Sequence, residues 1–213
     1  MEEKAFVKGE PQFYAPTSEP TALEIPPMRF LMIDGQGDPN EENGAYQQAV
    51  GMLFSLAYTL KMSGKGDHAP LGYFPYSVAP LEGLWSMANG MHGVYLSNKS
   101  GFAWTAMIRQ PDIVTDDALL WAKQEVLRKK KIDACAVRLE TYAEGLCVQC
   151  LHIGPYQDEP ATVARMETYL LTHRLTADHA HRRHHEIYLK SPQRTAPDKL
   201  HTILRIPVTL AAQ

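Results

Sequence analysis

The sequence predicts an α+β protein built from two copies of a β-α-β-β unit. Its 213 residues are 45% hydrophobic and 21% charged, a globular composition long enough for a substantial core. Short apolar runs bounded by glycine and proline alternate with longer segments whose apolar residues recur at helical spacing. Both halves of the chain repeat the order strand, Gly/Asp/Pro turn, helix, strand, strand. We therefore expect the two repeats to form an antiparallel sheet around a pseudo-twofold axis, with helices on one face and an open groove on the other.

The first repeat covers about residues 28–112. RFLMIDGQG at 29–37 is a short apolar run closed by glycines, which predicts a strand and a turn. Residues 44–62 have apolar side chains at helical spacing and predict a helix. Two strands at 75–87 and 101–110, joined by a Gly/Asn/Ser-rich hairpin near 89–101, complete this repeat.

The second repeat covers about residues 136–209 and follows a connecting helix from Thr115 to about Lys131. Thr115 is a suitable N-cap for that helix, and the basic run at its end offsets the helix dipole. The elements expected in this repeat are strands at 136–144 and 145–154, a helix from Ala161 to about His173, strands at 184–190 and 204–210, and a helical turn at 196–203.

Residues 1–27 are rich in proline and show no sustained period. They predict an arm laid over the surface of a single domain at 28–213.

Composition excludes several classes of function. A net charge of −3 and a pI near 6.3 give no electrostatic reason to expect a nucleic-acid partner. No apolar run approaches the ~18–20 residues of a membrane span, and MEEKAFVKGE lacks the apolar core of a signal peptide. Three cysteines are poor support for a disulfide framework. We expect a cytoplasmic protein without a direct nucleic-acid or membrane partner. The sequence is compatible with a homodimer.

The segment HHEIYLK contains the most informative pattern. Because side chains alternate across a strand, His184, Glu186 and Tyr188 share one face. The counterpart in the first repeat is PLEGLW, in which Glu82 precedes Trp85. We therefore expect the two related carboxyl groups to flank one groove.

Histidines crowd positions 179–185, and a zinc site is the obvious rival interpretation. His184 and His185 point to opposite faces of the strand, however, and two arginines nearby would repel a cation. We expect neither a metal nor an organic cofactor.

Several segments together resemble one known family. LHIGPYQDEPATVARM and HHEIYLKSPQRTAPDKLHTILRIPV are similar to the C-terminal half of GyrI-like small-molecule-binding proteins. FLMIDGQGDPN, PLEGLW and WTAMIRQPD are similar to the first half of the stand-alone subgroup of that family. The resemblance extends over about residues 28–209 and implies a tandem β-α-β-β (SHS2-type) fold with a central groove for bulky, flat, apolar and often cationic compounds.

The resemblance also implies alternative functions. In multidrug-responsive regulators the same module follows a DNA-binding domain, for which a 27-residue arm is too short. Some stand-alone members hydrolyse cyclopropanoid DNA-alkylating compounds by opening their strained ring, a detoxification. One alternative is a non-catalytic module that binds many drugs or senses a ligand. A further alternative is inhibition of DNA gyrase, but no feature of the sequence supports it.

The candidate site residues lie in four short segments, and most of them belong to the segments that carry the resemblance. Glu186 is the first choice as general base, with Glu82 the alternate, and Tyr188 is a catalytic hydroxyl. The expected ligand-binding residues are Trp85, Trp104, Met107, Tyr156 and His184.

Overall fold

The computed structural model describes residues 6–89 and 99–211. Nine strands form an antiparallel sheet with the path β1-β6-β9-β8-β3-β4-β2-β5, and β7 pairs with β9 beside that path. Strands of the first half meet strands of the second half where β3 pairs with β8. The predicted α+β class with an antiparallel sheet is confirmed.

The helices and strands follow the expected order with shifted ends. The strands are β1 (Thr21–Ile25), β2 (Met28–Gln36), β3 (Leu81–Met87), β4 (Phe102–Arg109), β5 (Arg138–Tyr142), β6 (Gly145–Ile153), β7 (Leu175–Ala177), β8 (His184–Tyr188) and β9 (His201–Leu210). The α-helices are α1 (Pro11–Tyr14), α2 (Ala45–Met62), α3 (Asp116–Lys130) and α4 (Glu159–Thr172). Five short 3-10 helices are η1 (Phe6–Gly9), η2 (Ser63–Lys65), η3 (Lys99–Gly101), η4 (Tyr156–Asp158) and η5 (Pro197–Lys199).

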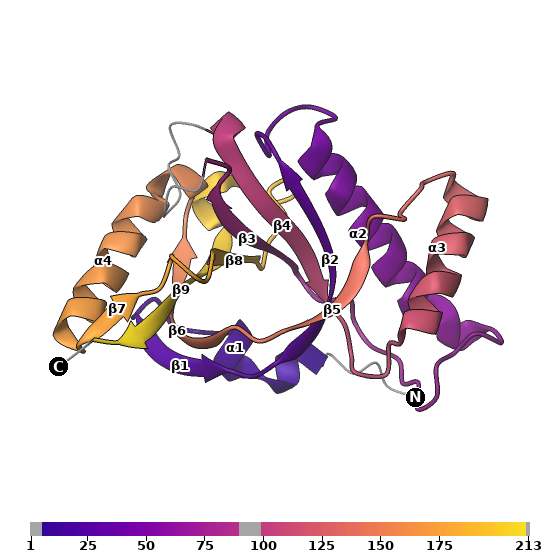
Figure 1. The fold of residues 1–213 in the computed structure, drawn as a ribbon, viewed down its shortest axis with the longest axis horizontal. Coiled ribbons are helices and arrows are strands. Elements are labelled where there is room, and N and C mark those ends of the chain that lie inside the picture. Colours follow the sequence, from indigo (N-terminus) through magenta and orange to yellow (C-terminus); the bar gives the residue numbers. More distant parts are fainter. Residues whose placement is uncertain (1–5, 90–98, 212–213) are drawn as a thin grey trace.

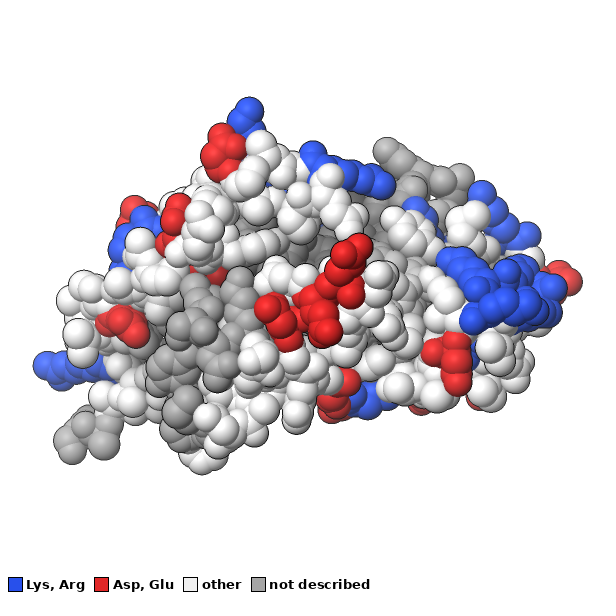
Figure 2. Space-filling view, turned by 90° about the horizontal axis from the view of Figure 1, so that it is seen from above, with Lys and Arg blue, Asp and Glu red and all other residues white. Residues whose placement is uncertain are grey.

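The two ends of α3 have the capping residue and the basic last turn that the sequence predicts. The Thr115 hydroxyl accepts a hydrogen bond from the Ala118 N–H at 3.2 Å and so caps the helix. Three basic residues occupy its last turn, and Figure 2 shows basic side chains gathered at the end of the molecule where α3 lies in Figure 1. Among the described residues, no helix is long and apolar enough to cross a membrane.

Two long helices, α2 and α4, pack on one face of the sheet, and α3 packs against α2. α2 contacts β2, β4 and α3, whereas α4 contacts β6 and β7. Figure 1 accordingly shows α4 at one end of the molecule and α2 with α3 at the other, with β3, β4 and β2 crossing between them. The α2 end and the α4 end each have a hydrophobic core of their own on this face. A space therefore separates α2 from α4 above the junction of β3 and β8.

The N-terminal arm covers the opposite face of the sheet. Its strand β1 pairs with β6 along the edge, an element that the proline-rich sequence did not predict. Phe13 and Tyr14 pack on this face against Leu84, Met107 and Ile187. The arm therefore completes a third hydrophobic cluster, which would be exposed without it.

Several expectations need correction. The groove does not lie on the face opposite the helices, because the arm occupies that face. The strand expected from residue 75 begins only at Leu81, directly after Pro80, because proline lacks the N–H needed for strand pairing. The helical turn expected at 196–203 is shorter, and β9 already begins at His201. Most of the hairpin expected near 89–101 lies outside the described residues.

Candidate functional site

A cavity of about 1160 Å³ lies between α2, the start of α4 and the β3–β8 pair. The arm and the segment after β8 also contribute to its walls. Its lining side chains are predominantly apolar or aromatic, with a small number of polar, acidic and basic groups, which is the usual make-up of a small-molecule site. The lining includes Tyr14, Tyr46, Val50, Phe54, Leu81, Trp85, Phe102, Tyr156, Glu159, Glu186, Tyr188 and Leu189.

A chain of three hydrogen-bonded side chains forms the floor of this cavity. The Trp85 indole Nε1 donates to the Tyr188 hydroxyl at 2.9 Å, and that hydroxyl donates to Oε2 of Glu186 at 2.7 Å. Nε2 of His184 lies 3.5 Å from the other carboxyl oxygen, Oε1. Neighbouring strands place these groups together, because Trp85 pairs with His184 and Gly83 pairs with Glu186 across β3 and β8.

Gly83 makes room for this arrangement. A Cβ at position 83 would lie 2.6 Å from Nε1 of Trp85 and 3.3 Å from the Tyr188 hydroxyl. Both distances are shorter than ordinary van der Waals contact, so a side chain here would displace the indole. The glycine in PLEGLW therefore allows Trp85 to lie along its own strand and reach Tyr188.

Aromatic rings hold the floor from two sides. Tyr46 of α2 lies with its ring centroid 5.3 Å from that of Trp85, and Phe102 of β4 packs edge-on against Trp85 at 5.7 Å. On the other side, Tyr156 meets Tyr188 edge-on at 6.0 Å. Such rings offer flat surfaces for a planar ligand and attract cations at their faces.

Glu159, the first residue of α4, is a second acid of the cavity that the sequence analysis did not identify. Its side chain is buried, and Oε1 has no hydrogen-bond partner. Burial, together with the negative charge of Glu186, raises the pKa of Glu159 to about 10, so its carboxyl group is protonated at neutral pH. Burial likewise raises the pKa of Tyr156 to about 12.

Glu82 does not share the cavity with Glu186, contrary to the expectation of two acids flanking one groove. The reason is strand alternation: Glu82 precedes Gly83 and points to the arm-covered face. There its carboxyl group accepts a hydrogen bond from the Tyr14 hydroxyl at 3.0 Å and lies 3.0 Å from Nε2 of His185. Glu82 is fully buried in this environment.

His185 connects Glu82 to a buried ionic network. Its Nδ1 lies 2.9 Å from Oε1 of Glu144, and Oε2 of Glu144 accepts from Arg205 at 2.9 Å. Arg205 also donates to the backbone oxygen of Phe13 at 2.6 Å, which fastens the arm. Burial alone would lower the pKa of His185, but the Glu144 and Glu82 carboxylates outweigh it and raise the value to about 9. The network thus stabilises the fold on the face away from the cavity.

Two other expected ligand-binding residues lie behind the walls. Trp104 is buried and packs edge-on against Tyr46 with centroids 5.0 Å apart, so it supports the lining without forming it. Met107 is fully buried in the cluster beneath the arm. Trp85, Tyr156, Glu186 and Tyr188 line the cavity as expected, whereas His184 reaches it only through Glu186.

The residues missed by the sequence analysis left weak signals. Tyr46, Val50 and Phe54 line the cavity from α2, and their i, i+4, i+8 spacing forms a second apolar stripe beside the core-facing one. Glu159 stands directly before Pro160, and acidic residues are common in the first turn of a helix. Its burial becomes visible only when α4 is placed beside β8.

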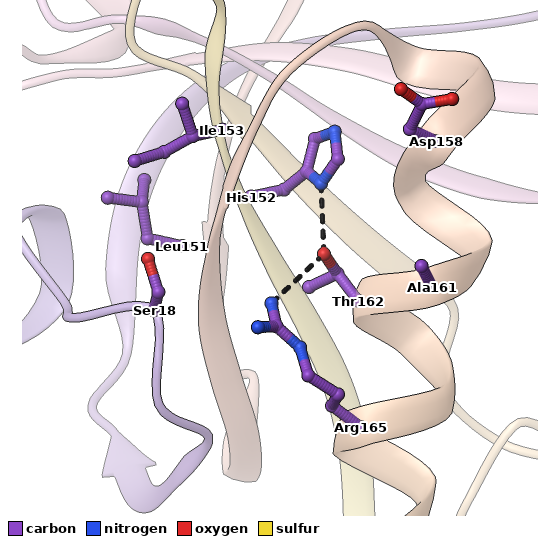
Figure 3. A pocket seen from close by; sticks show the side chains of 8 residues that line it. All are labelled: Ser18, Leu151, His152, Ile153, Asp158, Ala161, Thr162 and Arg165. Carbon is purple, nitrogen blue, oxygen red and sulfur yellow. Dashed lines mark hydrogen bonds between the residues drawn. The ribbon is translucent and has the colours of Figure 1, made fainter.

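A smaller pocket of about 380 Å³ lies between α4 and β6, as Figure 3 shows. Nδ1 of His152 lies 2.9 Å from the Thr162 hydroxyl, which also accepts from Arg165 at 3.2 Å. Nε2 of His152 lies 3.2 Å from the backbone oxygen of Pro155. These polar groups satisfy one another and fix α4 to the sheet, so we interpret the pocket as a structural contact.

The fold and the large cavity define a small-molecule-binding protein: helices on an antiparallel sheet enclose an aromatic space with acidic groups. The chain belongs to the GyrI-like family, since residues 18–209 match the GyrI-like small molecule binding domain. The resemblance inferred from the sequence is therefore confirmed. No curated protein matches the chain.

Solved structures agree with this assignment. A hydrolase from Listeria innocua is 42% identical with a TM-score of 0.89, and the match covers 98% of this chain and 100% of the other. An uncharacterized conserved protein from Listeria innocua is 43% identical with a TM-score of 0.89, covering 97% and 100%. The C-terminal domain of EcmrR shares the fold, with 10% identity, a TM-score of 0.55 and coverage of 91% and 98%.

Proposed function

We propose that the cavity binds flat, apolar and preferentially cationic compounds and hydrolyses strained electrophiles of the cyclopropanoid type, which would detoxify them. The observation on which this proposal depends is the Glu186 carboxyl group, held by Tyr188 on an aromatic floor within a large cavity. A planar cation stacked on Trp85 would gain about 0.5–2 kcal/mol from each favourable ring contact. Glu186 would supply the counter-charge where little water competes.

For hydrolysis, Glu186 acts as the general base. It removes a proton from a water molecule, and the resulting hydroxide oxygen bonds to a carbon of the strained ring. The ring C–C bond breaks, and its electron pair passes through the conjugated system to a carbonyl oxygen. General-base assistance of this kind contributes roughly 10²–10⁴ in rate, and ring strain favours the products.

The positions of the groups support this chemistry. The hydrogen bond from Tyr188 fixes the orientation of Glu186, and the bond from Trp85 fixes Tyr188 in turn. A base held in one orientation loses less entropy when the substrate arrives. The name hydrolase given to the 42% identical Listeria innocua protein agrees with an enzyme but identifies no substrate.

The test compares Glu186→Gln with a matched control, Glu167→Gln, which changes an exposed acid on α4. The substrate is a cyclopropanoid compound whose chromophore disappears when the ring opens. We expect Glu186→Gln to slow turnover by roughly 10²-fold or more, and Glu167→Gln to behave as the unmodified protein.

A second measurement separates the enzyme from the alternative of a non-catalytic binding module. Equilibrium titration with rhodamine 6G, a planar cationic dye, reports binding without chemistry. Tight, Glu186-dependent dye binding by a protein that leaves the cyclopropanoid intact would overturn hydrolysis and leave sequestration or ligand sensing. Ring opening at the same rate in both glutamine variants would remove Glu186 from the mechanism.

A further inference from the structure

Glu159 differs from the other acids of the cavity and of the ionic network because one of its oxygens is unpaired. Four buried side-chain atoms in the described residues have no hydrogen-bond partner, in Tyr76, Trp104, Gln110 and Glu159. Among these residues, Glu159 alone lines the large cavity. An unpaired buried polar group costs stability, so a site that keeps one is prepared for a group that arrives with the ligand.

The surroundings of Glu159 determine what that group can be. The side chain is only 5% exposed, and Glu186 is the charged group that acts on it. A second ionised carboxylate beside Glu186 would be repelled and poorly solvated, so Glu159 remains a neutral acid. A neutral carboxylic acid has an O–H to donate, and its natural partner is an oxygen acceptor such as a carbonyl.

We propose that Glu159 is the proton donor of this cavity: it hydrogen-bonds a carbonyl oxygen of a flat ligand and, as a catalytic acid, protonates that oxygen when the strained ring opens. The cavity then selects planar compounds that have both a polarised carbonyl and an apolar ring system. The catalytic half of this inference rests on the proposed function. The hydrogen-bonding half does not.

The two acids then have complementary roles in a balanced reaction. Glu186 takes a proton from water, and the hydroxide oxygen forms the new C–O bond as the ring C–C bond breaks. The electron pair reaches the carbonyl oxygen, which takes the proton of Glu159 and becomes a hydroxyl group. Proton return from Glu186 to Glu159 through solvent restores both acids, so the net change is addition of one water molecule. A pair of carboxyl groups whose environments separate their protonation states is the usual basis of such a division.

Binding tests the donor without any chemistry. The probes are acridone, a flat tricyclic ketone, and carbazole, a flat tricycle without the carbonyl. We expect the unmodified protein to prefer acridone by about tenfold, the size of one well-placed hydrogen bond. Glu159→Met, which keeps the volume but removes the donor, should abolish this preference, whereas Glu159→Gln, whose amide still donates, should retain most of it. A preference that is unchanged in Glu159→Met would overturn the proposal.

The variants themselves provide a folding control. Replacing an unpaired buried acid with methionine removes a desolvation cost, so Glu159→Met should unfold at the same or a higher temperature. If Glu159→Met does not fold, Glu159→Leu is the second donor-free variant, and retention of the acridone preference there would equally refute the donor.

Kinetics tests the acid. With a cyclopropanoid substrate, Glu159→Gln should lower the rate of ring opening by about 10²-fold while changing the substrate Kd by less than about threefold. An electron-withdrawing substituent makes the developing oxyanion less basic, so it should shrink the difference between the two proteins. If the difference in rate between the unmodified protein and Glu159→Gln does not change with the substituent, proton donation by Glu159 is refuted.

The two proposals can fail separately. If the unmodified protein opens no ring but shows the Glu159-dependent preference for acridone, hydrolysis is overturned and the carbonyl-binding donor stands. If ring opening depends on Glu186 but not on Glu159, hydrolysis stands and proton donation by Glu159 to the reacting oxygen is overturned.

Discussion

The hydroxyl of Tyr188 donates to Oε2 of Glu186 at 2.7 Å while it accepts the indole N–H of Trp85 at 2.9 Å. One phenol therefore connects the aromatic floor of the cavity to its acid. Because a hydroxyl has a single proton, accepting from Trp85 leaves that proton for Glu186. The direction of both hydrogen bonds is thus determined, and with it the orientation of the carboxyl group.

Tyr188→Phe should disturb both partners at once. The change leaves the Trp85 N–H without its acceptor and removes a donor from Glu186, and we expect the free energy of unfolding to fall by about 1–2 kcal/mol. Urea denaturation measures this loss, and Tyr58→Phe, at an exposed ring on α2, is the control. Affinity for rhodamine 6G should also fall in Tyr188→Phe. Equal stability and affinity in both variants would contradict a linking role for the hydroxyl.

Gly83→Ala should damage the cavity more than the sheet. The added methyl group would collide with the Trp85 indole, so the floor must shift. We expect weaker binding of rhodamine 6G by tenfold or more. Gly51→Ala on α2 is the matched control, since a Cβ there meets nothing within 4 Å and alanine stabilises a helix by roughly 0.5–1 kcal/mol. Unchanged dye binding in Gly83→Ala would refute the steric argument.

The buried network predicts a pH dependence of stability. The folded pKa of His185, about 9, exceeds its ordinary value of 6.5, so its stabilising contribution is complete below about pH 6.5 and is lost as the pH rises through 9. The contribution amounts to about 3 kcal/mol at most. The pKa of Glu144 is lowered to about 2, so its contribution is present above about 4.5 and is lost as the pH falls towards 2.

Denaturation midpoints measured between pH 5 and 9.5 check this expectation. The midpoint should decline above about 6.5 in the unmodified protein and in His181→Gln, which changes an exposed histidine. In His185→Gln the decline over this range should be smaller, and the part that remains comes from Glu159, whose raised pKa also costs stability as the pH rises. A midpoint that rises with pH over this range would contradict the assigned sign.

Phe13→Ala should release the arm. The ring packs in the cluster beneath the sheet, and its loss should cost about 3 kcal/mol of unfolding free energy. Gln12→Ala is a close control, because its side chain is exposed while its backbone oxygen still accepts from Gln149. Since arm residues such as Tyr14 also line the cavity, Phe13→Ala should weaken dye binding as well. If Phe13→Ala lowers the stability but leaves the affinity for rhodamine 6G unchanged, the arm does not contribute to ligand binding.

Local signals predicted most of the fold. Alternation in HHEIYL placed Glu186 and Tyr188 together correctly, and the cap at Thr115 began α3 as expected. The same alternation, applied to PLEGLW, places Glu82 and Trp85 on opposite faces of the strand. The similarity of the two halves was given more weight instead, which led to the wrong placement of Glu82. Strand β1 was missed because proline-rich flanks concealed a short run that pairs only with distant β6. Burial of Glu159 depends on how α4 packs, which no local pattern contains.

The β3–β8 pair has one set of side chains directed into the cavity and another directed beneath the arm. Changes at Trp85 or Glu186 can therefore reshape the compartment without touching the charges that hold the termini of the fold together. Such a division of labour within two strands gives the scaffold freedom to acquire new chemical preferences through substitutions on a single surface. Directed evolution restricted to that surface would be expected to yield altered selectivity with little loss of foldability.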